Sequence, residues 1–217
     1  MEQRFMSDRP TVFVVDDDLA MRESVAWMAR SAGLAVETFA TADQFLAACS
    51  PTRPGCLVID IRMPGMSGLE LQEQLASQRI MIPVIIVTGH GNVAAAVRAM
   101  KGGAIDFIEK PFEEGVLLER IRHAFHVDAE QRCAQARWAE IERRMARLTP
   151  REREVMAHVV SGKPNKLIAS LLGRSPKTIE IHRANVMKKM EATSLAELVR
   201  MARERPRAMA DRESSTA

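Results

Sequence analysis

The stretch IDFIEKPF, residues 105–112, is a short apolar run that ends in a lysine and a proline. Three earlier apolar runs also end in polar side chains, which are first Asp16 and Asp17, then Asp60, then Thr88. Short runs rich in β-branched residues are typical of buried parallel strands. We therefore predict strands at residues 11–15, 56–59, 84–87 and 105–108.

Segments with a helical spacing of apolar residues separate these predicted strands, at residues 19–32, 41–48, 69–77 and 93–100. Alternation of strand and helix indicates a doubly wound α/β fold with a parallel sheet. In such a sheet, ligands bind at the carboxyl ends of the strands. We therefore expect the polar side chains that follow the strands, Lys110 included, to converge on one site.

The residue types at this predicted site indicate phosphoryl transfer to a carboxylate. An aspartate can attack a phosphoryl group only if its repulsion from the phosphate oxygens is neutralised, which a divalent cation held by oxygen ligands achieves. Asp16, Asp17 and Asp60 could supply those ligands. The Thr88 hydroxyl and the Lys110 ammonium could donate to the phosphoryl oxygens. Loop acids that merely cap helices would not need this order and placement.

Residues 12–112 resemble the receiver domain of two-component response regulators, in particular that of the FixJ branch. The resemblance is carried by TGHG at residues 88–91 and AMKGGAIDFIEKPF at residues 99–112. It implies a flavodoxin-like fold with a five-stranded parallel sheet. It also implies that Asp60 is the phosphoacceptor and that a sensor histidine kinase phosphorylates it.

The same resemblance assigns roles to the rest of the pocket. Asp16, Asp17 and Asp60 would hold Mg²⁺, with the backbone carbonyl of Arg62 as a further ligand. Lys110 would contact the phosphoryl group. These assignments describe a phosphoacceptor with self-phosphotransfer and self-dephosphorylation chemistry, not an enzyme with a separate substrate.

Thr88 and Phe107 match the switch pair of that family, which also has a cis peptide before the proline matching Pro111. Two positions depart from the FixJ branch. Asn92 stands where an aspartate is frequent, and a glycine pair at residues 102–103 replaces a single glycine. Because glycine destabilises helices, we expect a looser switch region at that helix end.

Composition predicts a two-domain cytoplasmic protein. A chain of 217 residues that is 47 % apolar can form two modest cores. The apolar runs are too short to span a membrane, and residues 1–9 lack a signal-peptide core. Cys49, Cys56 and Cys133 lack metal-ligand spacing, and their odd number favours a reduced compartment.

Charge separates the two halves of the chain. Residues 149–217 carry 14 Lys and Arg against 8 Asp and Glu, whereas residues 1–148 carry 17 against 20. A basic C-terminal half attracts phosphates. Capping boxes at residues 149–152 and 194–197 and a turn at Gly173 predict four helices there, two of them forming a helix-turn-helix. The predicted helices lie at residues 149–160, 165–172, 176–190 and 194–203.

The third of these helices has two distinct faces. Ile179, Val186 and Met190 recur at helical spacing and should pack on the core. The opposite face is small or polar and suits a major groove. It carries Lys177, Glu180, Ile181, Ala184, Asn185 and Lys188.

Residues 148–202 resemble the LuxR-type four-helix DNA-binding domain, through GKPNK at residues 162–166 and TIEIHRANVM at residues 178–187. The resemblance implies duplex DNA as a partner and RNA polymerase as a candidate partner. Glu180 and Ala184 replace the lysines common in the wider group, so base preference cannot be transferred. Glu180 would accept from a cytosine amino group. Thr178 is a further expected DNA contact, and the expected phosphate contacts are Lys166, His182, Lys188 and Lys189.

Between the two resemblances, residues 113–147 predict one long helix or two abutting ones. Apolar residues spaced by four and three, at 134, 138, 141, 145 and 148, fit a short coiled coil or packing on the helix's own domains. The expected organisation is a receiver at 10–126, a helical linker at 127–147, a DNA-binding domain at 148–205 and a disordered tail at 206–217.

These patterns predict a response regulator that is phosphorylated on Asp60, dimerises and regulates transcription through its helix-turn-helix. Thr88 should move toward the phosphoryl group and Phe107 should turn inward behind it. That movement would free a homodimer face at residues 92–100 and 105–108. Its central apolar residues are Val93, Val97 and Met100.

Two other classes compete with this interpretation. Phosphatases of the haloacid dehalogenase type also use a strand-end aspartate and a second one two residues later, as Asp16 and Asp18 would be. Ala20 replaces their usual threonine or valine, however, and a helix-turn-helix has no place in them. The second alternative is a phosphorylation-independent DNA-binding protein with a vestigial receiver, which the complete set of pocket residues disfavours.

Overall fold

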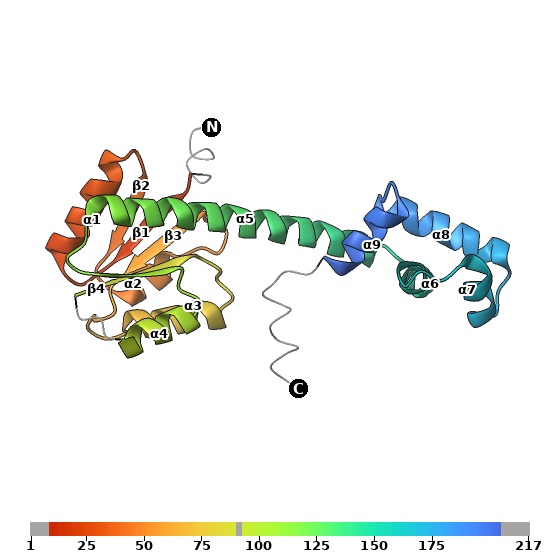
Figure 1. Ribbon diagram of the computed structural model, residues 1–217, viewed down its shortest axis with the longest axis horizontal. Coiled ribbons are helices and arrows are strands. Elements are labelled where there is room, and N and C mark those ends of the chain that lie inside the picture. Colours follow the sequence, from red (N-terminus) through yellow and green to blue (C-terminus); the bar gives the residue numbers. More distant parts are fainter. Residues whose placement is uncertain (1–8, 90–92, 205–217) are drawn as a thin grey trace. The chain divides into compact units, whose positions relative to one another are not determined.

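The computed structural model describes residues 9–89 and 93–204, and the chain divides into two compact units, Met1–Gln131 and Arg132–Ala217. Helices and strands of both units are drawn in Figure 1. Two hydrophobic clusters lie in the first unit and one in the second. Asn92 and the expected tail at residues 206–217 lie outside the described residues.

The first unit is built on a five-stranded parallel sheet in the order β2-β1-β3-β4-β5, which confirms the predicted doubly wound fold. The apolar runs predict every strand except β2. This edge strand is only partly buried and has Glu37 and Thr38 near its centre, so it lacks the apolar run of a buried strand. The strands are β1 Thr11–Val15, β2 Ala35–Phe39, β3 Gly55–Ile59, β4 Val84–Thr88 and β5 Asp106–Glu109.

Helices cover both faces of this sheet, and Figure 1 shows α3 and α4 on the opposite side from α5. Successive residues of β1 point to opposite faces, so Phe13 and Val15 join one cluster while Val12 and Val14 join the other. The first cluster includes side chains of α2, α3 and α4, and the second includes side chains of α1 and α5. These helices are α1 Leu19–Ser31, α2 Ala42–Ala48, α3 Gly68–Ser77, α4 Val93–Lys101 and α5 Glu114–Ala146.

The second unit contains the four predicted helices, α6 Pro150–Val160, α7 Asn165–Leu171, α8 Pro176–Met190 and α9 Leu195–Arg203. The capping box of Thr149 and Glu152 is present as predicted. The box predicted at α9 is only half formed. Ser194 accepts from the Glu197 amide, but the Glu197 carboxylate accepts from the amide and hydroxyl of Thr193, one residue further out.

Helix α5 is a single continuous helix, and its last turns belong to the second unit. Ile141 and Leu148 are buried in the core of that unit, with Trp138 and Met145 packed against it. Of the two interpretations of the apolar spacing, the structure therefore supports packing on the helix's own domain. A domain that began at residue 148 would lack Ile141 and so part of the hydrophobic core of the second unit.

The three cysteines are free thiols. Cys56 is buried, and burial together with the nearby Asp128 carboxylate raises the pKa of its thiol. Cys133 is exposed. Within residues 9–89 and 93–204, no helix is long and apolar enough to cross a bilayer.

Candidate functional site

The carboxyl ends of the strands bring together the polar residues that the sequence singles out. Asp16, Asp60 and Thr88 are 5 %, 7 % and 1 % exposed. The ammonium of Lys110 donates to Asp16 Oδ2 at 2.6 Å and to Asp60 Oδ1 at 3.2 Å. The Lys110 amide also donates to the Thr88 carbonyl at 2.9 Å, which ties the β5 end to β4. One cation therefore joins two buried carboxylates from different strands.

Backbone amides hold the other oxygen of each carboxylate. Asp60 Oδ2 accepts from the Arg62 amide at 2.6 Å, and Asp16 Oδ1 accepts from the Asp18 amide at 2.9 Å. Arg22 of α1 donates to the Asp16 carbonyl at 2.5 Å. Asp60 is therefore oriented, with Oδ1 toward the Lys110 ammonium.

The charge state of Lys110 follows from two opposing effects. Burial disfavours the ammonium and lowers its pKa, but hydrogen bonds and charge attraction from Asp16 and Asp60 outweigh burial. The pKa of Lys110 consequently lies above its ordinary value. The pocket therefore favours the charged form of Lys110 beside the Asp60 oxygen.

The third predicted metal ligand, Asp17, is exposed. In the described part of the chain, no three acidic, His or Cys side chains are grouped closely enough to hold a metal ion. The structure thus brings Asp16 and Asp60 together but not Asp17. The donor chemistry still fits Mg²⁺, because the carboxylates outnumber the single ammonium and Mg²⁺ prefers oxygen ligands.

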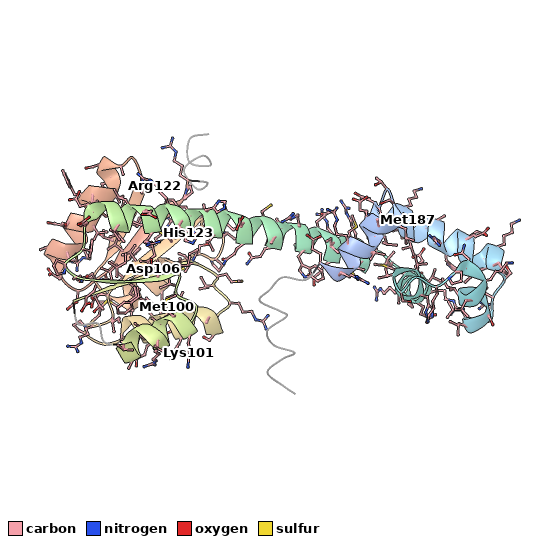
Figure 2. The ribbon with its side chains drawn as sticks, in the orientation of Figure 1. Met100, Lys101, Asp106, Arg122, His123 and Met187 are labelled. Carbon is pink, nitrogen blue, oxygen red and sulfur yellow. The ribbon has the colours of Figure 1, made fainter. Side chains whose placement is uncertain are left out.

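The predicted switch and dimer residues lie on α4 and β5. Phe107 is partly buried against the first cluster, and the Lys110-Pro111 peptide is cis, as the resemblance implies. Met100 on α4 and Asp106 on β5 are labelled in Figure 2. Three large apolar side chains of α4 face solvent, whereas Ala99 is buried: Val93 is 82 %, Val97 46 % and Met100 48 % exposed.

Helix α8 carries the second candidate site. Its predicted groove face, namely Lys177, Glu180, Ile181, Ala184, Asn185 and Lys188, is exposed throughout, as is Lys166 on α7. The opposite face is buried through Ile179, Val186 and Met190, and Met187, labelled in Figure 2, packs beside it. Ser175 caps the helix by accepting from the Thr178 amide, and their two hydroxyls hydrogen-bond to each other.

Three expected DNA contacts are less accessible than this face. Thr178 and His182 are only partly exposed, and Lys189 is paired with the carboxylate of Glu152 at 2.6 Å. That pairing joins α8 to α6, and sequence periodicity does not reveal it. Sequence patterns likewise give no signal for Gly68 and Gln72 of α3. Gly68 packs on the backbone of Asp60, and the Gln72 side chain donates to the Ala99 carbonyl of α4.

A parallel α/β unit with a carboxylate pocket at its strand ends, joined to a helix-turn-helix unit, defines a response regulator with a DNA-binding output domain. Comparison with known families agrees. Residues 12–122 match the response regulator receiver domain, and residues 146–202 match the luxR family of bacterial regulatory proteins.

Individual relatives show to which group of response regulators the chain is similar. The transcriptional regulatory protein FixJ of Azorhizobium caulinodans is 48 % identical over 91 % of this chain and 93 % of its own length. The structure of the response regulator StyR matches with a TM-score of 0.79 at 46 % identity, over 91 % of this chain and all of StyR. Full-length FixJ from B. japonicum matches with a TM-score of 0.55 at 46 % identity, over 90 % and 96 % of the two chains. The chain belongs to the FixJ-like response regulators, which are transcription regulators and not classical enzymes.

Proposed function

We propose that Asp60 accepts a phosphoryl group from a sensor histidine kinase. The observation that carries the proposal is the 3.2 Å contact between Asp60 Oδ1 and the Lys110 ammonium in a buried pocket. Asp60 Oδ2 accepts a short hydrogen bond from the Arg62 amide at 2.6 Å, whereas the contact of Oδ1 with Lys110 is longer at 3.2 Å, so Oδ1 would be the attacking oxygen. An O–P bond would form there as the P–N bond of a phosphohistidine breaks, and the departing imidazole nitrogen keeps the electron pair.

The residues around Asp60 account for the rest of this transfer. Lys110, already charged and oriented, would donate to a phosphoryl oxygen as charge develops there. The Thr88 hydroxyl would donate to another. Asp16, Asp17 and Asp60, with the Arg62 carbonyl, would hold Mg²⁺, which offsets the repulsion between carboxylate and phosphate when bound.

Phosphorylation would change the α4–β5 surface and favour a dimer. If Thr88 moves toward the phosphoryl group, the partly buried Phe107 ring has room to turn inward. The exposed residues Val93, Val97 and Met100 would then meet their counterparts in a second subunit around a two-fold axis. A dimer presents two recognition helices, which suits a DNA site with two half-sites.

DNA binding would use the exposed face of α8. Glu180, Ile181, Ala184 and Asn185 would face base edges, and Ile181 is apolar and 57 % exposed, which suits contact with a thymine methyl group. Lys166, Lys177, Thr178, His182 and Lys188 would contact the flanking backbone. RNA polymerase remains a proposed further partner. Family membership sets the haloacid dehalogenase alternative aside, and the assembled pocket favours a phosphorylation-dependent regulator over a vestigial receiver.

Chemical reduction of the acyl phosphate gives a stable derivative of the labelled residue. Locating that derivative by peptide mapping tests the central step. Incubation with acetyl phosphate and Mg²⁺ should give a hydroxylamine-sensitive adduct on Asp60, and Asp60→Asn should abolish it. Asp17→Asn should slow labelling without moving it to another residue. Labelling on Asp16, or full labelling of Asp60→Asn, would refute the proposal.

A further inference from the structure

Two neighbouring lysines in the last turn of α8 have different surroundings. Lys188 is exposed, and its ammonium has no ion-pair partner in the described part of the chain. The Lys189 ammonium, in contrast, lies 2.6 Å from Glu152 Oε2. Two lysines that the sequence does not distinguish therefore differ in the structure: Lys188 faces solvent, whereas Lys189 is bonded to another helix.

The partner of Lys189 is a buried carboxylate with two tasks. Glu152 is 3 % exposed, and the same Oε2 atom accepts from the Thr149 amide at 2.8 Å. The hydrogen bond from Lys189, helped by that of Thr149, lowers the pKa of Glu152 below its ordinary value. One ionised carboxylate thus caps the start of α6 and holds the end of α8.

This arrangement opposes the use of Lys189 on DNA. An ammonium that moved away from Glu152 to reach a DNA phosphate would leave the buried carboxylate unpaired, which is strongly destabilising. No comparable cost applies to Lys188. The two lysines should therefore contribute to DNA binding in different ways.

We infer that Lys189 is a positioning residue for the recognition helix and not a phosphate contact. Through Glu152 it holds the last turn of α8 against the first turn of α6, while Lys188 beside it neutralises a DNA phosphate. The inference rests on the proposed DNA-binding role of α8, and it revises the expectation that both lysines contact the backbone.

The salt dependence of DNA binding separates the two roles. Each phosphate contact that is removed lowers the slope of log K against log salt by about 0.9, whereas loss of a positioning group lowers affinity at every salt concentration without changing the slope. We would titrate the full chain, with Mg²⁺ and beryllofluoride, onto a pool of random-sequence duplexes. Because the beryllofluoride form is expected to bind as a dimer, Lys188→Met removes one phosphate contact from each subunit and should reduce the slope by about 1.8. Lys189→Met should keep the wild-type slope and bind more weakly.

A double variant covers the case in which Lys189→Met folds poorly. In Glu152→Gln with Lys189→Met, no charge is left buried, and the amide can still accept from Thr149. This variant should recover most of the lost affinity and retain the wild-type slope. A slope reduced by about 1.8, as in Lys188→Met, in either Lys189 variant would overturn the inference. A wild-type chain that binds without salt dependence would instead overturn the proposed function of α8 itself.

Discussion

At the scale of single residues, position 68 has room only for glycine, because it packs against the backbone of Asp60. A Cβ atom there would lie 2.2 Å from the Asp60 carbonyl oxygen, far inside contact distance. The Gly68 amide also donates to the Ile61 carbonyl at 3.0 Å. The start of α3 therefore packs directly on the backbone that carries the proposed phosphoacceptor, Asp60, and a side chain at 68 must displace it.

We expect Gly68→Ala to slow phosphorylation and to destabilise the receiver unit by about 1–3 kcal/mol, the usual cost of overpacking. Labelling rates with acetyl phosphate and urea unfolding measure the two effects. Gly115→Ala is the matched control, because nothing lies within 4 Å of its Cβ position in α5. The control should label normally and should not destabilise the protein, because alanine restricts the unfolded chain more than glycine does. Normal labelling by Gly68→Ala would contradict this account.

At the scale of elements, α3 holds the C-terminal end of α4 beside the proposed dimer face. Gln72 is buried, and its amide donates to the Ala99 carbonyl at 3.0 Å. A Cβ at Gly102 would lie 3.0–3.2 Å from atoms of that amide, so glycine leaves room for it. Gly103 follows with φ +92°, which ends the helix. The glycine pair thus permits a tie between helices, rather than simply loosening the helix end.

Replacing Gln72 by leucine should remove about 1 kcal/mol of stability, because Ala99 keeps its second hydrogen bond, from the Ala104 amide. Amide exchange at residues 99–104 should become faster. Arg98→Ala serves as the control: it breaks the exposed pair with Glu73 between the same helices and should cost under about 1 kcal/mol. Unchanged exchange in Gln72→Leu would show that the tie does not hold α4.

At the scale of the whole molecule, α5 contributes to the cores of both units. Leu117 and Ile121 are fully buried in the first unit, and Ile141 is buried in the second. Arg144 also donates to the Met190 carbonyl at 3.1 Å, at the end of α8. One continuous helix therefore supplies structural side chains to the receiver and to the DNA-binding unit.

Ile141→Ala should destabilise the second unit by about 2–5 kcal/mol, because it empties a buried site. Tryptophan fluorescence during urea unfolding, with Trp138 as the reporter in that unit, measures the loss. Val116→Ala, a partly exposed position on the same helix, should change stability little. Equal effects of the two substitutions would argue that α5 is only a linker.

Dimerisation is the second prediction at this scale. Sedimentation with beryllofluoride and Mg²⁺ should show the mass of two chains, and without them the mass of one. Val97→Asp should prevent the increase, because it places a charge in the apolar centre of the α4 face. Leu171→Asp, an exposed apolar position on α7, should dimerise normally. A dimer that persists in Val97→Asp would exclude this face.

The sequence alone determined the four buried strands, the convergence of four pocket residues and the exposed face of α8. Strand ends in a parallel sheet meet at one edge, so placing Asp16, Asp60, Thr88 and Lys110 on the strands places them together. Helical period likewise separates the two faces of α8. Edge strand β2 was not predicted from residue patterns, because partial burial gives no continuous apolar run.

Only the tertiary structure decided which neighbouring element Lys189, Gln72 and Gly68 contact. Lys189 binds Glu152 of another helix, Gln72 binds α4, and Gly68 leaves room for the Asp60 carbonyl. The apolar spacing at the end of α5 fits two kinds of packing equally well, and only the core of the second unit decides between them. Periodicity describes one element at a time, whereas each of these contacts depends on the distance between two elements.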